Sequence, residues 1–141
     1  MLTAERIAEV SALITPHIRQ TPLAHSQPLS AATGAEVYLK LENMQVTGSF
    51  KARGAMGKLL SLDAESRARG VLAASSGNHG AAVAYGARRL GVPAVVYVPN
   101  YADPGKVAAI EGYGASVHYH GDDCVETEAA ARRAAEERQM T

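Results

Sequence analysis

The sequence predicts an α/β fold built on a parallel sheet with helical crossovers, and three observations lead to this class. From residue 70 onward, short apolar segments alternate with longer helical ones, which is the pattern of strand–helix–strand connections. Capping residues such as Gly91, Asp103 and Asp123 stand at the expected helix ends. The segment 1–48 does not follow the alternation, so we expect it to belong to a different packing unit.

The expected elements are short and closely spaced. Before residue 70 the pattern predicts a helix, an extended stretch, a strand and a second helix, at residues 3–14, 21–23, 36–41 and about 50–61. After residue 70 it predicts three strands at 71–74, 94–98 and 115–119. Helices are expected at 81–90, from 104 onward, and from about 123 to 139. Because a strand would follow the last helix in such a sheet, we expect the chain to be truncated.

Composition narrows the possible functions. The chain is 47% hydrophobic and 5% aromatic, and its 14 basic residues balance 14 acidic ones. Without a basic excess, a nucleic-acid partner is not expected. Cys124 is the only cysteine, so an internal disulfide is impossible, and no Cys/His cluster with zinc spacing is present. No signal peptide or membrane span is expected, and we predict a cytoplasmic protein without a metal.

The first candidate site is the segment from Thr47 to Gly54, which places Lys51 where a loop meets a helix. A lysine amine becomes a nucleophile when burial or a neighbouring cation lowers its pKa. The positive end of the helix dipole disfavours the ammonium form, and Arg53 adds a charge close by. Phe50 could pack against a flat ring. The alternative is an ordinary exposed lysine at the start of a helix.

The second candidate site is the loop from Ser75 to Gly80, which lies between a buried strand and a helix. Free backbone N–H groups at a helix N-terminus bind anions, and the side chains of Ser75, Ser76 and Asn78 add polar groups. In open α/β sheets, ligands also bind at the carboxyl ends of the strands. A carboxylate or a phosphate would fit here. The alternative is a loop whose polar side chains only cap the helix.

The remaining patterns are weaker indications of a functional site. His79 is a candidate acid or base, although a lone histidine is more often a packing or surface residue. His118 and His120 lack a third ligand at suitable spacing, so we interpret them as structural. The stretch that begins at Gly112 starts like a dinucleotide fingerprint, but it precedes a strand and lacks the third glycine.

Together, the two motifs resemble those of the serine/threonine dehydratase family, which are pyridoxal-phosphate (PLP) enzymes of fold type II. The matching segments are Leu41–Ala55 and Ser75–Gly80, with Tyr113-Gly114-Ala115 further on. The resemblance runs from Thr21 to the end of the chain. It implies PLP as the cofactor and a small amino acid as the substrate. It further implies the small domain plus the leading part of the large domain, with residues 1–48 in the large domain and 49–141 in the small one.

The resemblance also implies residue roles. Lys51 would form the Schiff base with PLP and later take the α-proton of the substrate, so it is catalytic as well as cofactor-binding. Phe50 and Asn78 would bind the cofactor, the latter at its 3-hydroxyl oxygen. The substrate carboxylate would be bound by the loop residues Ser75, Ser76, Gly77, Asn78 and His79.

The implied reaction is that of an ammonia-lyase, which converts L-threonine or L-serine to a 2-oxo acid and ammonia. Ser76 keeps serine racemase open as an alternative, because racemases of this family use a serine at this place as a second catalytic residue. A hydroxyaspartate dehydratase is a further alternative. The resemblance also implies amino-acid metabolism, with isoleucine biosynthesis as one pathway, and a homo-oligomer at full length.

The chain departs from the family pattern in one respect. The family binds the PLP phosphate in a glycine-rich loop well after the lysine, and no such run of glycines follows here. We therefore expect the 141 residues to be inactive alone. A non-catalytic binding or structural fragment is the competing interpretation, although such a fragment would have no reason to retain the Lys51 motif.

Overall fold

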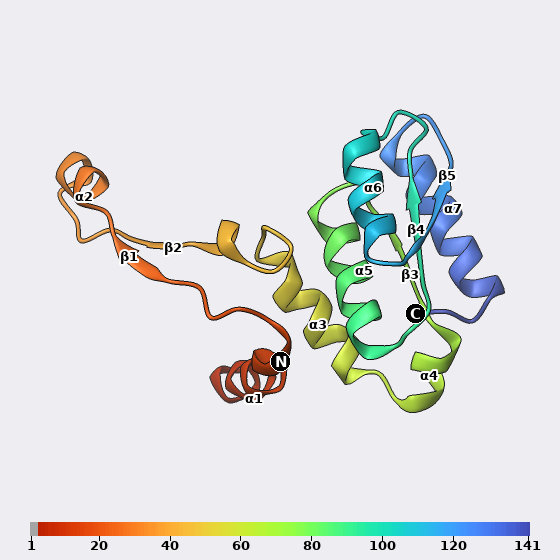
Figure 1. Cartoon of the computed structure of the whole chain (residues 1–141), viewed down its shortest axis with the longest axis horizontal. Coiled ribbons are helices and arrows are strands. Elements are labelled where there is room, and N and C mark those ends of the chain that lie inside the picture. The colour runs from red at the N-terminus through yellow and green to blue at the C-terminus, as the bar shows by residue number, and fades with distance from the viewer. Residues whose placement is uncertain (1–2) are drawn as a thin grey trace.

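The computed structural model describes residues 3–141, which form an α/β body and an arm that extends from it (Figure 1). We define the arm as residues 18–49. Met1 and Leu2 lie outside the described residues, and part of the expectation about the N-terminal segment rests on them. Among residues 3–141, no helix is both long and apolar enough to cross a membrane.

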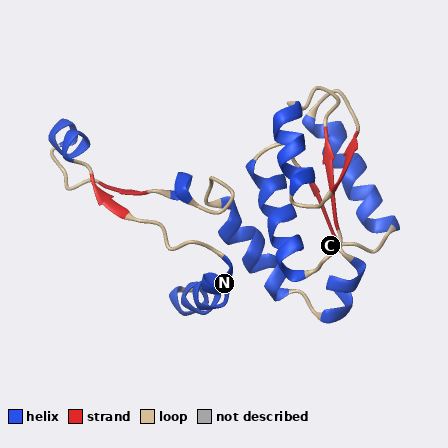
Figure 2. Ribbon diagram, viewed as in Figure 1, coloured by secondary structure: helices blue, strands red, loops and turns tan. Residues whose placement is uncertain are grey.

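The body contains the predicted parallel sheet, in the order β3-β4-β5 (Figure 2). These strands span Val71–Ala74, Ala94–Val98 and Ser116–Tyr119. The helices α5 (Asn78–Leu90) and α6 (Pro104–Gly112) lie on one side of the sheet, and α7 (Cys124–Glu137) lies on the other (Figure 1). Right-handed twist and helical crossovers favour this layered arrangement for parallel strands. The fold class predicted from the sequence is therefore confirmed.

The helix ends follow from local capping. Asp103 and Asp123 cap α6 and α7 with side-chain oxygens that accept the backbone N–H of Lys106 at 2.9 Å and of Glu126 at 2.8 Å. The end of α5 is set by Gly91, whose φ of 67° lies in the left-handed region. These three ends were predicted from the sequence and are confirmed.

Helix α5 begins three residues earlier than expected, at Asn78 instead of residue 81. The reason is Gly77, which adopts an extended conformation and whose carbonyl accepts the N–H of Ala81 at 3.2 Å. Half of the Ser75–Gly80 motif is thus helical. Its remaining residues form a short connection from the carboxyl end of β3.

Helix α3 (Lys51–Ser61) packs against α5, and the contact is unusually close at one glycine. A Cβ placed on Gly86 would lie 2.6 Å from Cδ1 of Leu59, so the end of the buried Leu59 side chain would have to move to make room for any side chain there. Met56, on the same face of α3, is completely buried. On its other side α3 contacts α1 (Ala4–Ile14), whose only buried residue is Ile14.

The arm forms a small antiparallel ribbon of β1 (Leu23–His25) and β2 (Tyr38–Lys40), with Leu23 opposite Lys40. Helix α2 (Gln27–Thr33) joins the two strands, and the short 3-10 helix η2 (Glu42–Met44) follows them. The sequence did not predict α2, because it is short and buries none of its residues. It also missed the 3-10 helix η1 (Thr15–His17) and α4 (Ala64–Arg69). The cap at Asp63 and the stop at Gly70 could have indicated α4.

One edge of the sheet carries a single additional pairing. On the side of β3 opposite β4, the N–H of Thr141 donates to the carbonyl of Gly70 at 3.1 Å. The N–H of Leu72 donates to the carbonyl of Thr141 at 2.8 Å. Two such bonds to one residue form the repeating unit of a parallel ladder.

Replacing Met56 by Ala tests the packing of α3 on α5. We expect the substitution to lower the free energy of unfolding by about 2–5 kcal/mol, because it removes a fully buried side chain and leaves a cavity. Urea denaturation measures the change. The matched control is Val125→Ala, at a side chain that is 75% exposed, with an expected change below about 0.5 kcal/mol. Equal effects of the two substitutions would contradict this account of the core.

Candidate active site

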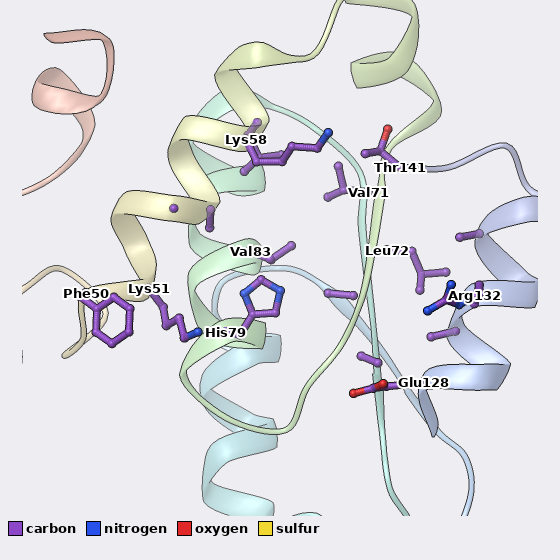
Figure 3. Close-up of a pocket in the computed structure, with 17 residues that line it drawn as sticks. Phe50, Lys51, Lys58, Val71, Leu72, His79, Val83, Glu128, Arg132 and Thr141 are labelled. Atoms are coloured by element: carbon purple, nitrogen blue, oxygen red, sulfur yellow. The ribbon is translucent and has the colours of Figure 1, made fainter. Parts of the chain in front are cut away.

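Lys51 is the first residue of α3, and its side chain lies at the mouth of a cavity of about 780 Å³. The amine points toward the ring of His79, which comes from the first turn of α5 (Figure 3). Nζ of Lys51 also lies 5.2 Å from the centroid of the Phe50 ring, within the range of a cation–π contact. The two predicted motifs thus meet at one opening.

The cavity lies between α3 and α5 on one side and α7 on the other, and β3 lines it between them (Figure 3). Its apolar lining includes Leu59, Leu72 and Val83. Two charged residues of α7, Glu128 and Arg132, face it from the side opposite Lys51. A flat, partly apolar molecule with polar substituents suits such a lining.

The loop after β3 exposes backbone N–H groups. The hydroxyl of Ser75 accepts the N–H of Gly77 at 3.2 Å within the loop, and no side chain caps the start of α5. Within the described chain, the N–H groups of Asn78, His79 and Gly80 have no hydrogen-bond acceptor. Three free donors at the positive end of a thirteen-residue helix can bind a carboxylate.

Glycine is required at position 80 by close packing. A Cβ there would collide with the backbone carbonyl oxygen of Ser75 and would lie 3.0 Å from Cδ1 of Ile110. At Gly77, in contrast, a Cβ would meet nothing within 4 Å. The loop therefore turns tightly on its inner side and is open at Gly77, which leaves room for a ligand beside the free donors.

The predicted site residues do not all line the cavity. Phe50, Lys51 and His79 line it. The others do not line it: Ser75, Ser76 and Gly77 form the connection between β3 and α5, and Asn78 is the first residue of α5. The roles assigned to these seven residues stay predictions.

Two features of its surroundings lower the pKa of His79. Partial enclosure by the protein lowers the pKa of the imidazole, and the positive charge of Lys51 lowers it further. Both effects disfavour the imidazolium form. The His79 ring therefore stays neutral down to a lower pH than that of an ordinary histidine, and in this form it can accept or donate a hydrogen bond beside the Lys51 amine.

Lys51 itself is exposed, and Arg53 does not stand beside it as a free cation. The Arg53 guanidinium instead pairs with Glu42, with an Nη2–Oε1 distance of 2.7 Å and an Nε–Oε2 distance of 2.9 Å. Arg53 was expected to add positive charge near Lys51, and the structure pairs that charge with Glu42. Its charge is neutralised by a carboxylate that sequence reasoning did not single out.

Glu42 shows the electrostatic effect of this pair. The hydrogen bond from Arg53 is the main cause that lowers the Glu42 pKa to about 2, and the hydroxyl of Thr21 contributes a further hydrogen bond. No periodicity marks Glu42, because it lies in a 3-10 helix and its partner is eleven residues away. Its position inside the same motif as Lys51 was the one available signal.

Across residues 3–141, no group of three or more His, Cys, Asp or Glu side chains could hold a metal ion. The polar groups nearest Lys51 at the cavity mouth are instead an imidazole and free backbone donors, with the charged side chains of Glu128 and Arg132 on the opposite side. These are groups that suit an organic, anionic ligand with a carbonyl carbon for the amine to attack.

Comparison with known families agrees with this chemistry. Residues 14–141 match the model of the pyridoxal-phosphate dependent enzyme family, and the chain belongs to that family. The L-threonine ammonia-lyase of Thermotoga maritima is 44% identical over 133 residues, which cover 94% of this chain and 33% of that protein. The chain spans between a third and two fifths of the length of the curated relatives it matches.

Solved structures give the same picture. The T.th. threonine deaminase superposes with a TM-score of 0.85 at 40% identity, covering 99% of this chain and 44% of that one. The serine racemase of Dictyostelium discoideum superposes with a TM-score of 0.91 at 36% identity, covering 99% and 46%. The fold is therefore common to a lyase and a racemase, and it does not by itself select one reaction.

The residues at the cavity fit the family's cofactor. PLP carries an aldehyde, and the exposed amine of Lys51 at the cavity mouth is a group that can bind it covalently. The Phe50 ring and the largely apolar walls suit a flat pyridine ring.

A titration of His79 tests the proximity of Lys51. Because both enclosure and the Lys51 charge lower the His79 pKa, Lys51→Ala should raise that pKa toward the ordinary value of 6.5. Proton NMR of the imidazole resonances against pH measures the shift. Lys58→Ala is the matched control, since Lys58 lines the same cavity but does not perturb His79. An unchanged His79 pKa in Lys51→Ala would contradict the geometry.

Acid unfolding tests the Glu42–Arg53 pair. Because the folded protein lowers the Glu42 pKa from 4.5 to about 2, the pair's contribution is fully present above about pH 5 and is lost as the pH falls toward 2. Removing the charge with Glu42→Gln should lower stability at pH 7 by about 1–3 kcal/mol. It should also flatten the decline between pH 5 and pH 2. Urea denaturation at several pH values gives both numbers, and parallel curves for the two proteins would refute the assignment.

Proposed function

We propose that the whole protein is a PLP-dependent ammonia-lyase that converts L-threonine or L-serine to a 2-oxo acid and ammonia. The observation that carries the proposal is the position of the Lys51 amine, which faces His79 at the cavity mouth beside the free N–H groups of α5. The 44% identity to an L-threonine ammonia-lyase supports the same reaction. The 141 residues alone should be inactive, because they contain no glycine-rich loop for the cofactor phosphate after Lys51.

We assign the following roles in the reaction to the residues of this chain. PLP, when bound, supplies an electron sink for the pair of electrons released at the α-carbon. Lys51 would hold the cofactor covalently, and its amine would be the base that accepts the α-proton of the substrate. Asn78 and Phe50 would contact the cofactor. The free N–H groups at the start of α5, with Ser75, Ser76, Gly77 and His79 around them, bind the substrate carboxylate and fix its orientation.

The neutral state of His79 supports this role for Lys51. An imidazolium next to Lys51 has no free lone pair, so it could not accept a hydrogen bond from the amine. A neutral ring can instead accept a hydrogen bond from the amine. The lowered pKa of His79 keeps the ring neutral down to a lower pH than in an ordinary histidine.

Serine racemase is the second candidate, and Ser76 is the observation that favours it. A racemase needs a second acid or base on the face of the α-carbon opposite the lysine, and a serine hydroxyl in the carboxylate-binding loop can provide it. The 36% identity to the Dictyostelium serine racemase supports this alternative. Ser76 is therefore proposed as catalytic only in that case.

The wider setting is also a proposal. We infer a cytoplasmic homo-oligomer, with serine as well as threonine among the substrates and isoleucine biosynthesis among the pathways served. The division into a large-domain segment (1–48) and a small domain (49–141) is supported by the arm, whose ribbon forms no sheet with the body.

Absorbance spectroscopy of the whole protein tests the proposed function. We expect a cofactor band near the edge of the visible range that Lys51→Ala abolishes. Lys58→Ala, a lysine on the same helix and in the same cavity, should retain the band. Assays with L-threonine and L-serine should then detect a 2-oxo acid.

Two results would decide against this proposal. Formation of a D-amino acid without 2-oxo acid would select the racemase. A wild-type protein that binds PLP but keeps its band in Lys51→Ala would remove Lys51 from the site.

A further inference from the structure

We propose that Glu42 is a positioning residue that holds the first turn of α3 through Arg53 and thereby places the Lys51 amine at the cavity mouth. This inference rests on the proposed function of Lys51. It adds a residue outside the cavity whose effect on the reaction passes through another side chain.

The start of α3 has no cap of its own. Phe50 occupies the N-cap position, where its side chain makes no capping hydrogen bond, and it is largely exposed. Helix ends without side-chain caps fray, because their first N–H groups lack partners. Since Lys51 is the first residue of this helix, its amine can keep one position only if the turn is held from outside.

Arg53 provides that external attachment. It lies two residues after Lys51 in the same turn, and its guanidinium forms two parallel bonds to the Glu42 carboxylate, at 2.7 and 2.9 Å. A two-bond arrangement of this kind fixes direction as well as distance. The Glu42 side chain is only 15% exposed, so water competes weakly for it.

Glu42 is itself fixed from the opposite side. Its Oε1 atom accepts the hydroxyl of the buried Thr21 at 2.5 Å. The carbonyl of Thr21 accepts Nζ of Lys40 at 2.6 Å, which ties the same residue to β2. The carboxylate therefore joins three separate segments, and it differs from the exposed ion pairs elsewhere on the surface.

Gln45 holds the loop that leads from Glu42 to Lys51. Its buried side-chain amide accepts the N–H of Arg19 at 2.7 Å and donates to the carbonyl of Arg19 at 2.9 Å, as a strand partner would. Its backbone carbonyl accepts the N–H of Gly48 at 2.8 Å, which closes the turn before α3. Gln45 thus ties the middle of this loop to Arg19 and to Gly48.

The loop's own hydroxyls do not contribute to this attachment. Oγ1 of Thr47 and Oγ of Ser49 are buried without a hydrogen-bond partner among the described residues. The loop is held instead by the bonds of Glu42 and Gln45, and by the hydroxyl of Tyr113, which donates to the carbonyl of Val46 at 3.3 Å. Of these three residues, Glu42 is the one that hydrogen-bonds to α3 itself.

Glu42→Gln and Arg53→Lys in the whole protein test the inference. Glutamine replaces one acceptor by a donor, and lysine keeps the charge but cannot form the two-bond contact. Each variant should lower kcat, measured per mole of bound cofactor, by about 10- to 100-fold, because a displacement near 1 Å misplaces a reacting group. KM should change by less than about threefold. The double variant should be no worse than the worse single one.

A second measurement does not require bound cofactor. Reductive methylation of the cofactor-free whole protein with ¹³C-formaldehyde labels the lysine amines, and Lys51→Ala identifies the Lys51 resonance. In Glu42→Gln and Arg53→Lys this resonance should shift or broaden, while that of Lys58 stays unchanged. Glu65→Gln is the matched control, since it removes an exposed ion pair with Arg69 at 2.6 Å on α4. It should leave kcat and both resonances as in the wild type.

The outcomes separate this inference from the proposed function. If the wild-type protein shows no absorbance band that depends on Lys51, the proposed function is contradicted. The NMR resonance of the labelled Lys51 amine can still show whether Glu42 positions that amine. A folded Glu42→Gln with kcat within about twofold of wild type and an unshifted Lys51 resonance overturns the inference. If Glu42→Gln fails to fold, Arg53→Lys decides by the same two measurements.

Discussion

The site depends on the close packing of α3 against α5. The two motifs are separated along the chain by α4 and β3, and they meet because α3 packs against α5, where Leu59 lies beside Gly86. A larger side chain at Gly86 would require the end of the Leu59 side chain to move. Lys51 and His79 lie at the same end of this helix pair, so their separation is set by the helix packing. A contact that contains no functional group therefore controls the geometry of the functional ones.

Near this contact, the two positively charged residues of the first turn of α3, Lys51 and Arg53, have different surroundings. Arg53 is directed away from Lys51 and neutralised by Glu42, which lies in the arm. Lys51 is left with two uncharged neighbours, the ring of Phe50 and the imidazole of His79. An amine in such surroundings meets less repulsion than it would beside a free guanidinium. The arm thus has an electrostatic role in addition to its structural one.

Much of the fold could be predicted because its signals are local. The three parallel strands and the caps at Gly91, Asp103 and Asp123 each depend on a few neighbouring residues, and they lie where the sequence placed them. Helix α2 escaped prediction because it buries nothing and so shows no periodicity. The partner of Arg53 escaped prediction for a different reason. An ion pair between a 3-10 helix and an α-helix leaves no trace in spacing, so the sequence indicated the charge of Arg53 but not the carboxylate that neutralises it.

The edge of β3 has a consequence for how the chain behaves in solution. Thr141 pairs with Gly70 and Leu72, but the alternation of a strand points the carbonyl of Leu72 and the N–H of Ala74 to the same side. These groups border a largely apolar cavity between α3 and α7. An open backbone edge beside apolar walls is a template on which any extended polypeptide can add as a new strand. On this edge, the carbonyl of Leu72 and the N–H of Ala74 already have the spacing that the next bonds of a parallel ladder require.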